Sequence, residues 1–334
     1  MNHSVSVMPH QSRFISHALS VTILAATAAM PLQAAEYPWR PVRFVVGFLP
    51  GGPSDTIARV LAGKLGEGLG QPVIVDNRAG AGGNLSSEIV ANAQPDGHTL
   101  LLGTGSALVT APILGQKIGF DPDRDFQAVT KLGDSMSILC AHPSLKVSNV
   151  QELIALAKAK PGEINYASSG VGVSNHLAAE LLSHMAGIRM THVPFKGSGA
   201  ALPALIGGQV HMGFGPLLPA IPHVKAGRLK ALGVSGIKRS TAAPDIPTVA
   251  EQGLKGFEVN SWYGLFVPAK TPKPVATRLH QEFTRVLALP EVKERLASQG
   301  VEVASSTPEQ LNALVRAERK LWGGVIKAAN IKIQ

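Results

Sequence analysis

The chain has 334 residues, of which 45% are hydrophobic and 16% charged, and its formal net charge at pH 7 is +9. This apolar content is enough for a large core, and the length suits two domains. Only 5% of the residues are aromatic, and the basic residues are dispersed in pairs, such as Lys158 with Lys160 and Lys270 with Lys273. Nucleic-acid binding needs a basic stripe with interleaved aromatic side chains, so the composition argues against a nucleic-acid partner.

The N-terminus has the pattern of an export signal. It carries one formal positive charge, on Arg13, and no acidic residue before an apolar stretch at 18–30. That stretch is too short for a permanent membrane span, which needs about 20 apolar residues. The small residues that follow suit signal peptidase. The sequence therefore predicts a periplasmic protein with a signal peptide at 1–34 that is cleaved after Ala34 or Ala35; an uncleaved anchor is the alternative.

Cys140 is the only cysteine. An internal disulfide is therefore impossible, and so is lipid attachment at a new N-terminal cysteine. Its neighbours Ile138, Leu139 and Ala141 are apolar, which predicts a small residue in the core. We expect an exported protein that is held together by its core rather than by disulfides.

Strands and helices alternate from residue 42 onward. The run 42–46 is β-branched, and a helix over 54–69 has Ile57, Leu61 and Leu65 at i+4 spacing on one apolar face. Apolar strands that alternate with helices indicate parallel sheets covered on both faces, an α/β fold. No flexible linker interrupts the pattern, so we expect two sheets joined by crossing strands. Further strands are predicted at 72–76, 98–102, 164–167, 191–195, 209–214 and 229–234. Further helices are predicted at 86–93, 150–160 with Ser148 as its cap, 174–185, 198–206, 274–287, 291–299 and 307–329.

Glycine-rich loops precede three of the predicted helices, at 48–55, 77–84 and 168–174. Each follows a predicted strand, at the carboxyl edge of a sheet, where open α/β folds bind ligands. Ser54 or Asp55 can cap the first of these helices, and helix N-termini favour anions. One such loop alone is more often only a capped turn. Three in parallel positions predict a site for a ligand with separated carboxylates.

Motifs for catalysis, metal binding or nucleotide binding are weak. Residues 103–108 resemble a dinucleotide fingerprint but lack its third glycine, and no nucleophile elbow or phosphate-binding Gly-Lys-Ser/Thr motif is present. His176, Glu180 and His184 are spaced to share one helix face, yet surface residues in this pattern are commoner than a metal site. Trp262, with the tyrosine after it, could line a cleft, cross between domains or pack in the core. The sequence predicts no enzyme, no cofactor and no metal.

Several segments carry a resemblance to a known family, in order along the mature chain. They are 40–46 with the loop Pro50-Gly51-Gly52-x-x-Asp55, then 71–84, 93–100, 165–170, 192–197 and 245–251. Together they resemble the tripartite tricarboxylate transporter receptor family, also called Bug receptors. The resemblance implies a type II periplasmic-binding fold, in which two α/β lobes joined by crossing strands close on a ligand in the cleft between them. Lobe 1 is expected at 36–133 and 263–334, and lobe 2 at 134–262.

The resemblance also implies how the ligand is held. In the family the Pro-Gly-Gly-x-x-Asp loop and the Ser-Ser-Gly loop hold a ligand carboxylate, partly through ordered water. We expect backbone N–H groups at Gly51 and Gly52 to receive a carboxylate, together with those at Ser169 and Gly170. The role expected for Asp55 is capping or water ordering. The predicted ligand-binding residues are Phe48, Pro50, Gly51, Gly52, Ser54, Asp55, Asn84, Ser168, Ser169, Gly170, Ser174, Lys196 and Gly215.

Two departures from the family bear on the ligand. Leu49 and Pro53 stand where the first loop commonly has proline and a small residue. Gly215 and Pro216 stand where many members carry Asp-Asn. Losing those polar side chains removes hydrogen-bonding capacity from the second lobe. We therefore expect an apolar or aromatic carboxylate rather than an amino acid or a hydroxylated acid.

The resulting functional prediction is a monomeric receptor that captures a small carboxylate. The family's usual partners are a large and a small integral-membrane transporter subunit, to which the receptor would deliver its ligand. A sensing module for a sensor kinase would share every feature of the sequence and is the main alternative. An exported enzyme is the less favoured one, because the sequence offers no better titratable set than the three residues of the predicted 174–185 helix.

Overall fold

The computed structural model describes residues 1, 3–4, 6, 37–240 and 242–328. The predicted cleavage site, and nearly all of the predicted signal peptide, lie outside these residues. Within the described ranges, no helix combines the length and the apolar character that a membrane crossing requires.

The first sheet is built around β1, whose five residues pair in parallel with β2 on one side and with β3 on the other. The predicted face of the first helix is confirmed, since Ile57, Leu61 and Leu65 are fully buried. They pack in one cluster with the apolar residues of β1, such as Phe44. In chain order the elements are β1 (Val42–Val46), α1 (Pro53–Leu69), β2 (Val73–Asn77), α2 (Asn84–Ala91) and β3 (Thr99–Thr104).

The second sheet repeats this arrangement later in the chain. Its central strand β5 pairs in parallel with β6 and with β7. In chain order the elements are α4 (Val150–Ala159), β5 (Asn165–Ser168), α5 (Ser174–Ala186), β6 (Thr191–Pro194), α6 (Ser198–Ile206), β7 (Met212–Pro216), α7 (Leu217–Lys225) and β8 (Lys230–Val234). The sequence missed α7, whose segment contains prolines at 219 and 222; proline inside a helix removes a hydrogen bond and weakens the helical signal.

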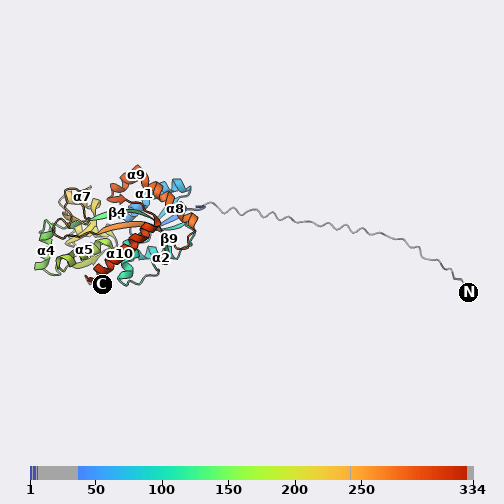
Figure 1. The fold of residues 1–334 in the computed structure, drawn as a ribbon, viewed down its shortest axis with the longest axis horizontal. Helices are drawn as coiled ribbons and strands as arrows, with labels where there is room; N and C mark the ends of the chain where they lie inside the picture. Colours follow the sequence, from blue (N-terminus) through green and yellow to red (C-terminus); the bar gives the residue numbers. More distant parts are fainter. Residues whose placement is uncertain (2, 5, 7–36, 241, 329–334) are drawn as a thin grey trace. The chain divides into compact units, whose positions relative to one another are not determined.

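One long strand, β4 (Phe126–Ala141), belongs to both sheets. Its first part pairs antiparallel with β9 (Asn260–Pro268), and its last five residues pair antiparallel with β7. Figure 1 shows β4 and β9 running between the part of the molecule that holds α4, α5 and α7 and the part that holds α1, α8 and α9. The expected crossing strands are therefore present, although the sequence predicted neither β4 nor β9. The purely parallel sheets that were expected are in fact mixed, because these strands enter antiparallel. The exact lobe boundaries remain a prediction.

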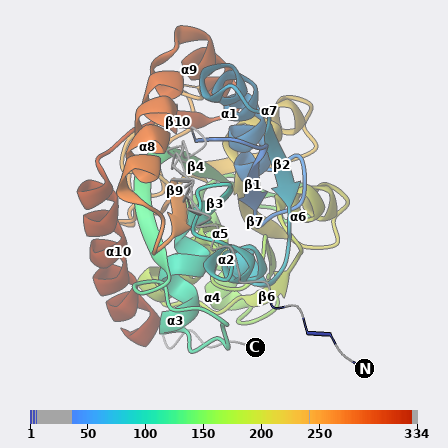
Figure 2. The same ribbon diagram turned by 90° about the vertical axis from the view of Figure 1, so that its right-hand side faces the viewer.

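The C-terminal segment returns to the first sheet. It forms α8 (Lys273–Ala288), α9 (Pro290–Ala297), the short strand β10 (Val301–Val303) and α10 (Pro308–Ala328). Phe283 of α8 meets Phe44 of β1 edge to face, with ring centroids 5.7 Å apart. The three helices lie along one side of the molecule, coloured orange to red in Figure 2. α10 also contacts β4 and the single turn at Ser106–Thr110, after β3, which brings the end of the chain to the crossing strand.

Two predicted helix caps differ from the structure. Helix α4 is capped by Asn149 rather than Ser148, because the Asn149 side chain accepts a hydrogen bond from the Glu152 N–H at 2.8 Å. The cap position of α1 is Gly52, and no side chain caps that helix. The polar residues at the start of α1 are therefore available for other contacts.

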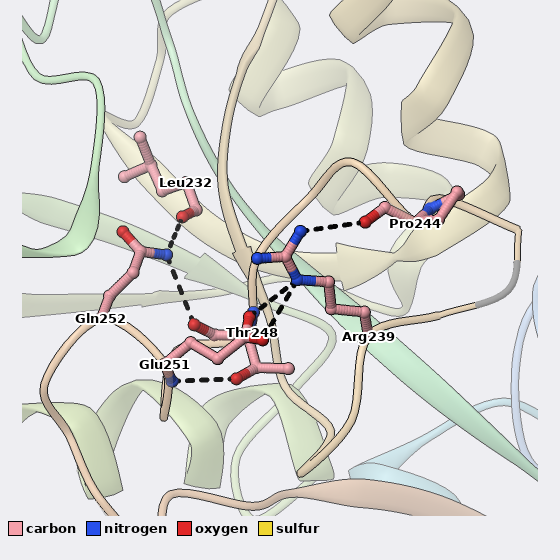
Figure 3. Close-up of polar contacts among 6 residues, drawn as sticks. All are labelled: Leu232, Arg239, Pro244, Thr248, Glu251 and Gln252. Atoms are coloured by element: carbon pink, nitrogen blue, oxygen red, sulfur yellow. Dashed lines mark hydrogen bonds and ion pairs between the residues drawn. The ribbon is translucent and has the colours of Figure 1, made fainter.

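The segment after β8, which contains the motif at 245–251, is fixed by reciprocal polar contacts (Figure 3). The Glu251 N–H donates to Thr248 Oγ1 at 3.0 Å, and the Thr248 N–H donates to the Glu251 carboxylate at 2.7 Å. This is the pattern of a capping box. Arg239 Nε donates to the same carboxylate at 2.9 Å, and Gln252 accepts from the N–H of Val150 at the start of α4. The motif therefore joins this segment to α4 and has a structural role.

Candidate functional site

A cavity of about 110 Å³ lies where the two sheets meet. One water molecule needs roughly 10–15 Å³ by this measure, so the cavity has room for a small organic molecule. Its wall is formed by loops of the first sheet, loops of the second sheet, β4, β9 and α10. Ligand sites of periplasmic receptors and other two-lobed proteins are expected at such a junction.

Three helices point their N-termini at this cavity. The lining includes Gly52 and Ser54 at the start of α1, Ser174 and Asn175 at the start of α5, and Ser198 at the start of α6. The first N–H groups of a helix have no partner within it, and the helix dipole makes this end positive. Three such ends at one cavity make it suited to an anion.

Six of the sequence-predicted residues line the cavity and seven do not. Those in the lining are Phe48, Gly52, Ser54, Ser169, Ser174 and Gly215. Those outside it are Pro50, Gly51, Asp55, Asn84, Ser168, Gly170 and Lys196. Of the three predicted glycine-rich loops, the structure brings 48–55 and 168–174 to one cavity, with part of each behind the wall, and no residue of 77–84 is in the lining.

Three of the backbone N–H groups expected to receive a carboxylate already donate within the chain. The Gly51 N–H donates to Asp55 Oδ2 at 3.0 Å. The Ser169 N–H donates to Asn175 Oδ1 at 3.1 Å, and the Gly170 N–H donates to the Ser168 hydroxyl at 3.2 Å. These contacts shape the loops. The anion-binding capacity of the cavity therefore lies at the helix N-termini more than at these three N–H groups.

Asp55 holds the first loop in place. Its carboxylate is 6% exposed and accepts hydrogen bonds from the Gly51 N–H, from Arg59 Nε and from Asn77 Nδ2. Burial by itself would raise the pKa of this carboxyl, but the three donors outweigh burial and hold the pKa below its ordinary value. Gly51 has a φ of 88°, a conformation that glycine adopts at little cost, so the turn over Asp55 depends on that residue.

The remaining predicted residues behind the wall also have other partners. The Asn84 side chain is buried and donates to Gln116 Oε1 at 2.7 Å. Ser168 is fully buried, and its hydroxyl is 2.6 Å from His192 Nε2. Lys196 is exposed. The structure therefore gives Asn84 and Ser168 supporting roles, and it places Lys196 on the surface.

A direct hydrogen bond joins the two sides of the cavity. The Thr110 hydroxyl, in the segment after β3, donates to the Gly172 carbonyl in the loop before α5 at 2.5 Å. Both residues line the cavity. The carbonyl of Val171 also lies 3.3 Å from the position that a Cβ on Gly82 would occupy. The loops of the two sheets are therefore in contact beside the cavity.

Sequence reasoning missed the wall that β4, β9 and α10 contribute. The lining from these elements is Ser135, Met136, Ser137, Asn260, Ser261, Trp262, Tyr263, Glu318 and Trp322. The alternatives that the sequence offered for Trp262 and Tyr263 are observed together, since both residues line the cavity and are also buried in the hydrophobic clusters. No local pattern marked Glu318, since an acidic residue in an amphipathic C-terminal helix is ordinarily solvated.

Of the candidate metal triad only His176 is buried, and it belongs to an aromatic stack with His192 and Tyr166. His176 is 3% exposed, accepts from the Gly172 N–H at 3.0 Å and stacks on His192 with centroids 4.1 Å apart. His184 is exposed, on another face of the helix. Among the residues that the structure describes, no group of three or more His, Cys, Asp or Glu side chains is placed to hold a metal ion. Burial lowers the pKa of His176 to about 3 and that of His192 to about 4.

Comparison with known families and proteins gives a consistent result. Residues 57–331 match the family described as "Tripartite tricarboxylate transporter family receptor". The protein BugT of Bordetella pertussis is 35% identical over 317 residues, which are 95% of this chain and 97% of BugT. A protein from the tcbD-tcbE intergenic region of Pseudomonas sp. strain P51 is 38% identical over 92% of this chain and 91% of its own length.

Solved structures are similar across the same region. Rpa4515 of R. palustris, solved with adipate, has a TM-score of 0.85 and 34% identity, and the match covers 89% of this chain and 99% of that one. MatC of Rhodopseudomonas palustris, solved with bound malate, has a TM-score of 0.81 and 35% identity over 87% of this chain and all of that one. The periplasmic binding protein BugD has a TM-score of 0.83 and 35% identity over 89% of this chain. The expected two-lobed α/β binding fold is confirmed by these likenesses.

Replacing Asp55 with Asn should destabilise the first loop. The amide lacks the negative charge that strengthens the bonds from Arg59 and the Gly51 N–H, and its Nδ2 would replace one of the two acceptor oxygens. A hydrogen bond to a charged group contributes about 1.5–3 kcal/mol. Because Arg59 is 55% exposed, the expected loss in the free energy of unfolding is at the lower end, about 1–2 kcal/mol. Urea unfolding at pH 7 measures it. Asp245→Asn, at an exposed side chain, is the control and should change little; equal effects of the two would contradict this role.

The histidine stack should make stability pH-dependent. The pKa of His176 and that of His192 are lowered in the folded state, so their stabilising contribution is complete above the unfolded pKa of about 6.5 and is lost as the pH falls below it. His176 alone can contribute a slope of up to about 1.4 kcal/mol per pH unit. Unfolding between pH 6.5 and 5 should show a shallower slope for His176→Gln than for His184→Gln. An unchanged slope in His176→Gln would rule out this origin.

Proposed function

The chain belongs to the tripartite tricarboxylate transporter receptor family, and from this premise we propose that it is a periplasmic receptor for a small carboxylate. It captures the ligand in the cavity between its sheets and delivers it to an integral-membrane transporter with a large and a small subunit. The observation that carries the proposal is the convergence of the N-termini of α1, α5 and α6 on one cavity. Adipate and malate, the ligands of two solved relatives, are both carboxylates.

The carboxylate is held by the helix N-termini. Its oxygens accept hydrogen bonds from the N–H group of Gly52 and from first-turn N–H groups of α5 and α6, where the helix dipoles also favour a negative charge. The hydroxyls of Ser54, Ser169 and Ser174 lie in the same lining and supply further donors, directly or through water. Asp55, Asn84 and Ser168 act behind this layer by holding the loops in position.

The body of the ligand lies against a mixed wall. Phe48, Met136 and Leu177 supply apolar surface in the lining. Gly215 leaves space, because a Cβ placed there would meet no atom within 4 Å. A family member with Asp at this position would fill that space with a charged group. This chain therefore offers room next to the N-termini of α5 and α6 instead.

Ligand binding is coupled to contact between the lobes. The Thr110–Gly172 hydrogen bond joins the two sides of the cavity. A ligand that touches helix ends on both sides prefers the state in which they are close, and this preference shifts the population toward the closed form. The closed receptor is the form that a transporter can distinguish from the empty one.

A thermal-shift screen tests the receptor function. Mature protein is heated with monocarboxylates, dicarboxylates, tricarboxylates, amino acids and nicotinate-like aromatic acids. A ligand that binds only the folded state stabilises it by about 2.7 kcal/mol at 100 times its Kd, so one class should raise the Tm in a concentration-dependent way. The screen is repeated on refolded protein, to remove any ligand carried through purification. No shift from any acid after refolding would refute the proposal.

Replacing Gly215 with Asp should weaken binding of the carboxylate that the screen identifies. The new carboxylate would lie in the lining beside the helix N-termini and repel the ligand's charge. We expect a loss of about tenfold in affinity, or about 1.4 kcal/mol, measured by calorimetry. Gly63→Asp makes the same charge change on the exposed side of α1 and should leave the affinity unchanged. Equal affinities for wild type and Gly215→Asp would contradict this part of the site.

A further inference from the structure

An acidic side chain lies in the cavity that we assign to an anionic ligand. Glu318 of α10 lines the cavity together with Trp322, one turn later on the same helix, and with Trp262 of β9. Trp322 Nε1 donates a hydrogen bond to Glu318 Oε2 at 2.8 Å. The cavity therefore has two kinds of wall: helix N-termini that attract a negative charge, and a carboxyl group set between two indoles.

Among the residues that the structure describes, no cation forms an ion pair with this carboxyl. The next residue, Arg319, turns away to pair with Asp123 and to donate to the Leu108 carbonyl. Lys131 is paired with Asp134 at 2.6 Å. Throughout the described ranges Glu318 takes part in no ion pair, and the Trp322 indole N–H donates to it. A largely buried carboxylate without a cation is costly unless something else supplies one.

The electrostatic surroundings of Glu318 also disfavour the charged form of its carboxyl. Burial raises the pKa of its carboxyl above the ordinary value, and the charge of Asp134 adds to this, although the indole N–H groups and Lys131 act in the opposite direction. A carboxylate left incompletely satisfied at a cavity wall is where a ligand gains the most by supplying a hydrogen-bond donor.

We propose that Glu318 receives a second group of the ligand, an ammonium or another N–H or O–H donor, so that the receptor selects carboxylates that carry such a group. This inference rests on the proposed function, because the ligand's carboxylate must occupy the helix N-termini. It revises the expectation of a wholly apolar ligand body that follows from Gly215 and Pro216 alone. The missing polar contact of the second lobe is replaced by an acid on α10.

The negative charge of Glu318 would determine which ligands the cavity selects. A dicarboxylate would bring its second negative charge to the wall that holds Glu318, where like charges repel in a partly desolvated site. A methyl group there would leave the carboxyl without a partner. A cationic donor pairs with it and is also attracted by the faces of indole rings. The chain should therefore differ from the relatives solved with adipate and malate in rejecting simple diacids.

A set of matched ligands tests whether the second group of the ligand is a hydrogen-bond donor, an apolar group or a carboxylate. For each carbon skeleton the screen includes versions that end in an ammonium, a methyl or a carboxylate group, such as 4-aminobutanoate, pentanoate and glutarate, and hydroxyl versions are added. Kd values are measured by calorimetry on wild type, Glu318→Gln and Glu302→Gln. Gln at 318 keeps an oxygen for the Trp322 N–H, so the variant should fold. Glu302 is an exposed residue of β10 outside the cavity, and its variant is the control for net charge.

The expected result is that the best skeleton binds at least tenfold more tightly in its ammonium or hydroxyl version than in its methyl or carboxylate version. Glu318→Gln should reduce that ratio at least tenfold if the donor is charged, and Glu302→Gln should keep it. The ratio is taken within one protein sample, so a fraction of unfolded variant does not affect it. Tight binding of a diacid or of a methyl-ended acid, or a ratio that Glu318→Gln leaves unchanged, would overturn this inference while the proposed function stands. Binding of no carboxylate at all would overturn both.

Discussion

The N-terminal N–H groups of α1, α5 and α6 have no partners within their own helices, and the structure collects these ends at one cavity. The strands that precede these helices are connected through β4, which is shared by both sheets: it reaches β1 through β9 and β3, and it reaches β5 and β6 through β7. An anion is the natural occupant of such a place, because it accepts several hydrogen bonds and is favoured by three helix dipoles together. The proposed receptor function depends on this convergence of helix N-termini more than on any one side chain.

The residues of the two loops at 48–55 and 168–174 lie in two layers, one in the cavity lining and one behind it. Gly52, Ser54, Ser169 and Ser174 face the cavity. Others in the same loops are occupied with holding them: Asp55 braces the turn at Gly51, and Ser168 is bonded to His192 under the second loop. A buried polar network that is well satisfied makes a loop rigid, and a rigid loop loses less entropy when it binds a ligand. The division explains why a motif can be needed for binding although part of it never touches the ligand.

In the proposed function, the wall formed by β4, β9 and α10 selects among carboxylates. It contains serines, two tryptophans and one acid, Glu318, which has no ion-pair partner among the described residues. Two of the similar solved structures hold carboxylates, adipate and malate, and helix N-termini suit such anions in general. A residue such as Glu318 can then distinguish one receptor from another, because the energy of a partly buried charge changes strongly with the group placed next to it.

The sequence by itself determined the elements that depend on local patterns. The i+4 face of α1, the apolar strand β1 and the glycine-rich loops before α1 and α5 were all predicted, because helix periodicity and turn chemistry are short-range properties. The tertiary structure decided the rest. The strand β4 contains Gly133, Asp134 and three serines or threonines among apolar residues, so no local pattern marks it as the strand that joins the sheets; its stability comes from pairing with β7, β9 and β10. Glu318 reaches the cavity from a helix whose own pattern is that of a solvated surface, and only packing against β4 turns it inward, since a side chain's burial depends on neighbours that are distant in the chain.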